Sequence, residues 1–169
     1  MVKLIVAKAN NNAIGKNNQL IWHLPDEMKY FTKNTTGHVV VMGRKNWDSI
    51  PQKFRPLVGR INVVVTRNAE FKAEGCFTVL SIEEAIEKFG NEPGRDLIII
   101  GGGQIYHQAI RKNLVDEMFV TEVDETFEAD TFFPDFDEKL WVRERLGEHA
   151  IDEKHRFSFT FFKYRKRPA

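Results

Sequence analysis

Six short stretches of the chain are apolar, and most of them run continuously rather than alternating with polar residues. They are Val2 to Ala9, Val39 to Met42, Ile61 to Thr66, Phe77 to Leu80, Leu97 to Ile100 and Met118 to Val123. A strand that is apolar on both faces must be covered on both faces, and helices provide that cover in a largely parallel sheet. The pattern therefore predicts an α/β fold.

Helical patterns lie between these strands. The clearest runs from Ser81 to Phe89, where Ser81 and Glu84 have the spacing of a capping box and the apolar residues share one face. Three further helices are expected to begin near Pro25, Arg44 and Gln104. After Trp141 the pattern changes, because Phe157, Phe159 and Phe161 alternate along the chain. This alternation indicates an antiparallel strand that closes one edge of the sheet.

Length and charge limit the classes of function. A chain of 169 residues suits one domain, and its 25 basic and 24 acidic residues leave a net charge of +1. Such a balance gives no broad positive field for binding nucleic acid or a membrane surface. Cys76 is the only cysteine, and no apolar stretch or leader pattern suggests a membrane span or secretion. We expect a cytoplasmic, monomeric protein that acts on small molecules.

Three of the predicted strands end in residues that suit anion binding. The segments that follow them are Gly43-Arg44-Lys45, Thr66-Arg67 and Gly101-Gly102-Gly103. Glycine lets a ligand approach the backbone, a helix start favours negative charge, and arginine offers a planar fork to phosphate. Any one junction alone is more simply a turn with a solvated basic residue. Together, at the carboxyl ends of parallel strands, they predict a dinucleotide site.

The dinucleotide site differs from the Rossmann design, because Tyr106 stands where the glycine fingerprint requires a third small residue. Arg44 or Lys45, together with Arg67, could both contact a 2'-phosphate. Charge-assisted bonds of about 1.5 to 3 kcal/mol each would then favour NADPH over NADH by roughly a hundredfold to ten-thousandfold. The sequence therefore predicts NADPH as the cofactor.

A second candidate segment, from Leu20 to Phe31, leads a loop into a helix whose first turn holds Asp26 and Glu27. Both acids could simply complement the positive end of the helix dipole. Helical spacing separates them, because Asp26 shares its face with Lys29, Tyr30 and Lys33, whereas Glu27 faces the core. Among Trp22, Met28 and Phe31, the Glu27 carboxyl would lose solvation and its pKa would rise. Glu27 is therefore the candidate proton-handling group.

At this point the chain resembles the dihydrofolate reductase family, in its bacterial chromosomal form, across essentially its whole length. The matching segments, in the family's order, are Ile14-Gly15, Trp22-x-Leu24-Pro25-x-Glu27 with Phe31, Met42-Gly43-Arg44 with Trp47 and Ile50, Gly59-Arg60-x-Asn62, Ile100-Gly101-Gly102-Gly103 with Ile105-Tyr106, Thr121, and Asp130-Thr131-x-Phe133-Pro134. The resemblance implies a single domain over residues 1–169 with a mixed, mostly parallel sheet of about eight strands and about four helices. It also implies an adenosine-binding subdomain at about residues 38–95.

The implied reaction is hydride transfer from NADPH to 7,8-dihydrofolate, which supplies tetrahydrofolate for one-carbon metabolism. Glu27 would bind and polarise the pterin and favour its protonation by water, and Trp22 would position that water. Thr121 would support both the Glu27 carboxylate and the pterin. Leu20 would close over the nicotinamide. Arg60 would hold the glutamate carboxylate of the substrate. The residues implied to contact the substrate, or antifolate inhibitors, are Ile5, Ala7, Glu27, Met28, Phe31, Ile50, Leu57, Arg60, Ile100 and Thr121.

The resemblance also implies which residues surround the cofactor, and it implies no metal. The cofactor-binding set is Ala7, Ile14, Gly15, Gly43, Arg44, Lys45, Asn46, Thr66, Arg67, Ile100, Gly101, Gly102, Gly103, Gln104, Ile105 and Tyr106. The peptide bond between Gly101 and Gly102 is expected to be cis, as in relatives.

Three alternatives remain open. A nucleotide-binding regulatory module would keep the glycines and arginines but would not need Glu27 and Thr121. A nucleic-acid binder could use the basic tail from Lys163 to Arg167, although the net charge argues against it. A related pterin or deazaflavin-type reductase of the same fold, such as a riboflavin-pathway reductase, would lack the acid-bearing segment that ends at Phe31.

Overall fold

The structure is a computed structural model and describes residues 1–168, so that of the predicted domain only Ala169 lies outside the described residues. Its strands are β1 (Val2–Ala9), β2 (Ala13–Gly15), β3 (Val39–Gly43), β4 (Ile61–Val65), β5 (Cys76–Val79), β6 (Leu97–Gly101), β7 (Glu117–Val123), β8 (Thr131–Phe132), β9 (Trp141–His149) and β10 (Phe159–Lys166). Its helices are α1 (Pro25–Thr35), α2 (Arg44–Ser49), α3 (Ile82–Phe89) and α4 (Gly103–Arg111), with 3-10 turns η1 (Gln52–Phe54) and η2 (Glu138–Leu140).

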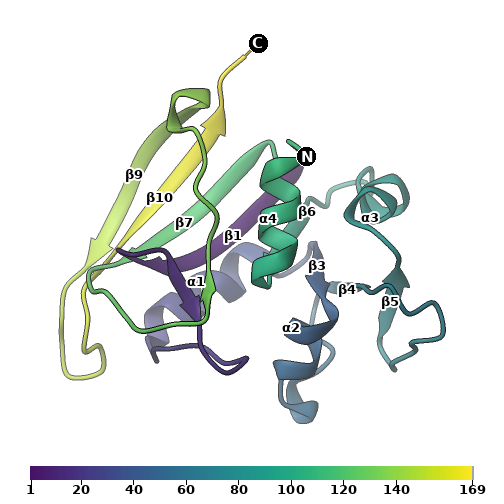
Figure 1. Cartoon of the computed structure of the whole chain (residues 1–169), viewed down its shortest axis with the longest axis horizontal. Coiled ribbons are helices and arrows are strands. Elements are labelled where there is room, and N and C mark those ends of the chain that lie inside the picture. Colours follow the sequence, from purple (N-terminus) through teal and green to yellow (C-terminus); the bar gives the residue numbers. More distant parts are fainter. Residues whose placement is uncertain (169) are drawn as a thin grey trace.

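Eight strands form one twisted sheet in the order β5-β4-β3-β6-β1-β7-β10-β9, and β2 pairs with β8 beside it (Figure 1). The six strands from β5 to β7 are mutually parallel, whereas β10 runs antiparallel to both β7 and β9. The first strand, β1, lies in the interior of the sheet between β6 and β7. The predicted mixed sheet with an antiparallel C-terminal edge is confirmed.

Both faces of the sheet are buried, as the continuous apolar runs require. In β3, Val39 and Val41 pack into one cluster with Ile82 of α3 and Ala109 of α4, whereas Val40 packs into a second cluster on the opposite face. Figure 1 shows α4 in front of the sheet and α1 behind it. The second cluster, beneath α1 and α2, is the one that borders the candidate site.

Two local predictions need correction. The side chain of Ser81 caps α3 by accepting from the Glu84 amide at 3.0 Å, but the Glu84 carboxylate accepts from the amide of Leu80 rather than from that of Ser81. The C-terminal strand begins at Phe159, so that Phe157 precedes it and packs instead against Phe127, with ring centroids 5.0 Å apart. Among residues 1–168, the structure contains no helix with both the length and the apolar character needed to span a membrane.

Candidate active site

Glu27 lies in the first turn of α1 and is held against the interior. The helix begins at Pro25, directly after the fully buried Leu24, and this entry turns Glu27 inward until its residue surface is only 9% exposed. Burial raises the pKa of the Glu27 carboxyl from 4.5 to about 7, because water no longer stabilises its charge. The predicted rise in pKa is confirmed, and the carboxyl can gain or lose a proton near neutral pH.

Two other predictions about the first turn of α1 are wrong. Met28 does not help to bury Glu27, because it is 47% exposed and lines a shallow hollow on the outer side of α1 with Lys29. Asp26 does not lie on a simply solvated face, because Tyr30 on the same side packs against Phe161 with ring centroids 4.0 Å apart. The antiparallel edge strands cover this side of α1, and helical periodicity alone could not reveal that cover.

The strands behind Glu27 bring Ile5, Ala7, Thr121 and Tyr106 together. Ala7 of β1 stands opposite Thr121 of β7, whose side chain is fully buried. The Tyr106 hydroxyl of α4 donates a hydrogen bond of 2.8 Å to the backbone carbonyl of Ile5. Burial, and then the charge of Glu27, raise the pKa of the Tyr106 hydroxyl, so these residues share one electrostatic environment. The structure therefore places the predicted acid, threonine and tyrosine around one end of β1.

Five of the residues predicted to contact the substrate form one apolar surface. Ile5 and Ile100 are buried in the cluster beneath α1, and the half-buried side chains of Phe31, Ile50 and Leu57 pack against it. These residues come from β1, β6, α1 and the segment between α2 and β4. Their arrangement suits a flat aromatic molecule with an apolar middle section.

Arg60 stands beyond this apolar surface. Its Nη1 donates to the Thr35 hydroxyl at 3.0 Å and its Nε donates to the Val58 carbonyl at 2.9 Å, while partial burial lowers its pKa. The loop that carries Arg60 is fixed by the buried Asn62, whose amide accepts from the Leu57 backbone N–H and donates to the Leu57 and Arg60 carbonyls.

Asn62 and Thr35 are not among the residues predicted from the sequence to act at the site. A signal for Asn62 was present, because it is the only amide in the apolar run of β4. Thr35 gave no comparable signal, since its hydroxyl lies at the end of α1 and contacts Arg60 only after folding.

The three glycine and arginine junctions meet at one edge of the sheet. Gly43 stands opposite Val65 of β4, and its neighbour Met42 stands opposite Gly101 of β6. A methyl group added at Gly43 would lie 2.9 Å from Ile105 Cγ1, whereas one added at Gly102 would meet nothing within 4 Å. The Gly101-Gly102 peptide bond is cis, as expected. Gly102 is the N-cap residue of α4 and provides no side-chain cap, so the first-turn backbone N–H groups have no side-chain acceptor there.

Basic side chains surround this edge. Arg44 is exposed, stacks on Phe71 with its guanidinium carbon 3.9 Å from the ring centroid, and pairs with Asp48 at 3.4 Å. Lys45 and Arg67 are exposed, and Thr66 between β4 and Arg67 is buried. Three more residues of the predicted cofactor set belong to the helices that begin after β3 and β6: Asn46 is half-buried in α2, Gln104 is exposed in α4, and Ile105 of α4 is buried.

The loop between β2 and α1 borders the same edge. Ile14 and Gly15 belong to β2, and Leu20 beyond them is 61% exposed and does not reach the buried residues. The Asn18 side chain donates to the Lys45 carbonyl at 3.3 Å, which ties the loop to α2. Trp22 is buried, and its indole N–H has no acceptor within the described residues.

Replacing Glu27 with Gln should stabilise the protein at alkaline pH. Folding raises the pKa of Glu27 from 4.5 to about 7, so the protonated carboxyl contributes to the free energy of unfolding. This contribution is complete below pH 4.5 and is lost as the pH rises through about 7. The loss amounts to about 3 kcal/mol. Gln does not ionise, so the stability of the variant does not fall with pH in the way that the stability of the wild type does. Urea unfolding should show the stability difference, variant minus wild type, increasing by about 3 kcal/mol between about pH 4 and about pH 8. A difference that stays constant with pH would contradict a buried, ionising Glu27.

Comparisons with known proteins agree with this geometry. A family model described as dihydrofolate reductase matches residues 1–166. The chain is 35% identical to the dihydrofolate reductase of Bacillus subtilis over 99% of this chain and 95% of that one. It is 38% identical to that of Neisseria gonorrhoeae over 96% of each. A solved structure of dihydrofolate reductase from Enterococcus faecalis, complexed with NADP(H) and RAB-propyl, is 30% identical and superposes with a TM-score of 0.86 over 99% of this chain and 97% of that one.

Proposed function

This chain belongs to the dihydrofolate reductase family and reduces dihydrofolate to tetrahydrofolate with NADPH, and from that premise we propose how its residues divide the work. The observation that carries the proposal is the buried Glu27 carboxyl, which has a pKa of about 7. It belongs to α1, the helix that also supplies Phe31 to the apolar surface. We call the carboxyl ends of β3 and β6, with Gly43 and Gly101 to Gly103, the glycine edge. A reductase of this kind needs an oriented pair of flat rings, a dry site and a proton.

Glu27 binds and polarises the pterin. A carboxyl with a pKa near 7 is poised between its two forms at neutral pH, where a group that handles protons is most effective. It acts indirectly, by favouring protonation of the pterin N5 from water. The buried Trp22 indole N–H, which has no acceptor among residues 1–168, is suited to position that water, and Thr121 supports both the acid and the pterin.

The rest of the substrate lies along the apolar surface. Phe31 and Ile50 enclose the pterin and benzoyl groups, Leu57 lines the same groove, and the carbonyls of Ile5 and Ile100 face the pterin edge. Arg60 binds the glutamate carboxylate, and its bonds to Thr35 and Val58 fix the guanidinium in advance. Met28 and Leu20 are exposed in the described conformation, so their contacts require the ligand to extend over α1 and the loop to close.

The glycine edge fits NADPH. The open space beside Gly102, the uncapped start of α4 and the exposed Arg44, Lys45 and Arg67 together offer backbone N–H groups and positive charge to phosphates. NADPH supplies the hydride from its nicotinamide ring when bound. The nicotinamide-binding residues are Ala7, Ile14, Asn46 and Tyr106, with Gly15 nearby, and the phosphate-binding ones are Gly43, Arg44, Lys45, Gly101, Gly102, Gly103, Gln104 and Ile105.

Thr66 and Arg67 hold the adenosine end, and residues 38–95 form the adenosine-binding subdomain. Support comes from the consecutive pairing of β3, β4 and β5, which makes this segment one contiguous edge of the sheet. We place the protein in the cytoplasm as a monomer, which fits its single half-buried cysteine, Cys76.

The loss of NADPH absorbance on adding dihydrofolate tests the assignment. Oxidation should require dihydrofolate, should give equal amounts of NADP and tetrahydrofolate, and should fall away when an antifolate is added. A protein that binds NADPH but gives no turnover would instead be the regulatory module considered above.

A further inference from the structure

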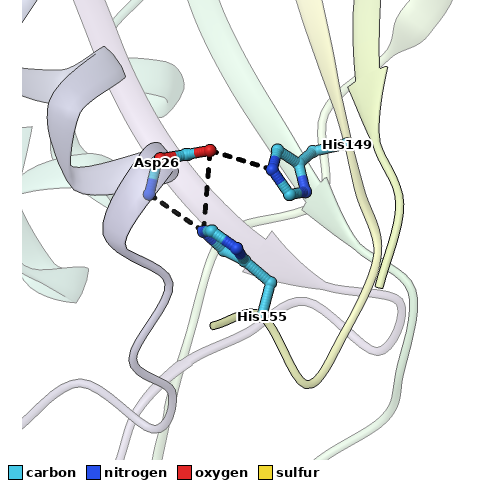
Figure 2. Close-up of side chains that lie close together, drawn as sticks. All are labelled: Asp26, His149 and His155. Atoms are coloured by element: carbon cyan, nitrogen blue, oxygen red, sulfur yellow. Dashed lines mark hydrogen bonds and ion pairs between the residues drawn. The ribbon is translucent and has the colours of Figure 1, made fainter. Parts of the chain in front are cut away.

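Three side chains of the types that ligate metal ions meet where the start of α1 approaches the end of β9 and the loop before β10. Asp26 belongs to the first turn of α1, His149 ends β9, and His155 lies in the loop before β10 (Figure 2). Asp26 Oδ2 is 2.9 Å from His149 Nε2 and 3.9 Å from His155 Nε2, and the three candidate ligand atoms all lie within 4.8 Å of one another. Figure 2 shows both imidazole rings directed at the Asp26 side chain.

The hydrogen bonds of His155 fix its tautomer. Its Nδ1 lies 2.8 Å from Asp152 Oδ1, an acceptor, so Nδ1 carries the proton. Its Nε2 therefore has a lone pair, which accepts from the Asp26 backbone N–H at 3.0 Å. The residue is 1% exposed, and a carboxylate behind the ring fixes the orientation of a histidine in the way that metal-ligating histidines require.

His149 faces oxygen acceptors with both ring nitrogens. Its Nδ1 is 2.7 Å from the Ala150 carbonyl, which can only accept, so Nδ1 carries a proton. Its Nε2 then faces Asp26 Oδ2 at 2.9 Å and Asp152 Oδ2 at 3.5 Å, both carboxylate oxygens. A lone pair at this position would be repelled by both carboxylates. The two carboxylate oxygens therefore make the space beside Nε2 favourable for a positive charge.

We propose that Asp26 Oδ2, His149 Nε2 and His155 Nε2 form a site for a divalent cation of the zinc class. Two imidazole nitrogens and one carboxylate oxygen are a ligand set that such ions take, with solvent as a fourth ligand. Tetrahedral bonds of about 2.0 Å place ligand atoms about 3.3 Å apart. The Asp26 oxygen lies about 0.4 Å inside that spacing from His149 Nε2 and about 0.6 Å outside it from His155 Nε2.

Metal binding requires the lone pairs of both histidine Nε2 atoms. Any proton on His149 Nε2 leaves to solvent when the metal binds, and the Asp26 backbone N–H gives up its bond to His155 Nε2, whose lone pair the metal takes while Asp152 still holds the ring. The charges of Asp26 and Asp152 then balance the two positive charges of the ion. His149 stacks flat on the buried Phe159, with ring centroids 4.9 Å apart, so its position is already held. The ion would join α1 to the loop between β9 and β10.

Titration of the full chain with Co2+ tests this site. One equivalent should give the intense visible absorption of a tetrahedral Co2+ site, and Zn2+ should displace it. Zn2+ should also raise Tm, because the ion binds the folded state, and a chelator should reverse the rise. Asp26→Asn keeps the backbone N–H that donates to His155 Nε2 but removes the carboxylate ligand. This variant should lower Co2+ affinity about tenfold or more, and His149→Gln should do the same.

Two further variants sharpen the result. Asp152→Asn leaves all three ligands in place and should weaken binding about 10- to 100-fold through the orientation of His155. The matched control is His107→Gln, which changes an exposed histidine of α4 and should leave binding unaltered. Absence of tetrahedral absorption, or absorption that is the same in Asp26→Asn and His149→Gln as in the wild type, would overturn the proposal and leave the three side chains as a hydrogen-bonded cluster.

Discussion

Replacing Glu27 with Gln should lower kcat for dihydrofolate by about 100- to 10,000-fold at pH 7, the range expected when a positioned proton-handling group is lost. Gln has the size of Glu and can still donate to the pterin, but it cannot carry the negative charge that favours protonation of N5. The effect should therefore appear mainly in the chemical step. Single-turnover oxidation of NADPH, followed by absorbance, measures that step directly.

Lowering the pH should partly restore kcat in the Glu27→Gln variant, because a substrate already protonated in solution does not depend on the enzyme to promote protonation of N5. The wild type should lose activity as the pH rises above about 7, where the Glu27 carboxyl and the pterin lose the proton that they share. Glu83→Gln makes the same chemical change in the first turn of α3 and should leave kcat unaltered. A Glu27→Gln variant with wild-type kcat at pH 7 would remove Glu27 from the mechanism.

Replacing both Arg44 and Arg67 with Ala should abolish most of the preference for NADPH over NADH. Both side chains are exposed at the ends of the adjacent strands β3 and β4. Two charge-assisted bonds of about 1.5 to 3 kcal/mol each correspond to a change in the ratio of kcat/KM values of about a hundredfold to ten-thousandfold. The loss should appear with NADPH, and the values for NADH should change little.

Each single variant should lose roughly half of this free energy if Arg44 and Arg67 act independently. Arg44 has an additional role to separate, because it stacks on Phe71 and pairs with Asp48. Arg44→Lys keeps the charge but loses the planar stack, and so distinguishes the two contributions. Arg111→Ala removes a positive charge at the end of α4 and serves as the matched control. An unchanged NADPH preference in the double variant would place the 2'-phosphate elsewhere.

The parallel core of the fold could be predicted because strands that are buried on both faces are continuously apolar in sequence. The runs in β3, β4 and β6 contain almost only apolar residues, and the structure pairs them in parallel. The start of β10 was predicted less accurately. Phe157 continues the alternation of Phe159 and Phe161, but its backbone lies outside the strand. Alternation reports which side chains are buried, and Phe157 is half-buried through its contact with Phe127.

The burial of Glu27 could be predicted because the spacing along one helix held the information. Spacing along α1 was enough to separate Glu27 from Asp26, but it failed for Met28, because the chain offers no local sign of which neighbours cover the outer side of a helix. The pairing of Asp26 with His149 joins residues that are far apart in sequence and depends on the register between β9 and β10, in which His149 stands opposite Phe159. Such contacts follow from tertiary structure alone.

The position of β1 in the interior of the sheet also determines the order in which this protein can be completed during its synthesis. Val2 pairs with Leu97 and Lys3 pairs with Glu117, so β1 has no sheet partner until the chain has been made at least as far as β6. By contrast, β3, β4 and β5 pair with their neighbours in sequence and can associate early. The apolar strand β1 therefore stays unpaired while β3, β4 and β5 associate, and an unpaired apolar strand of this kind is exposed to aggregation during synthesis.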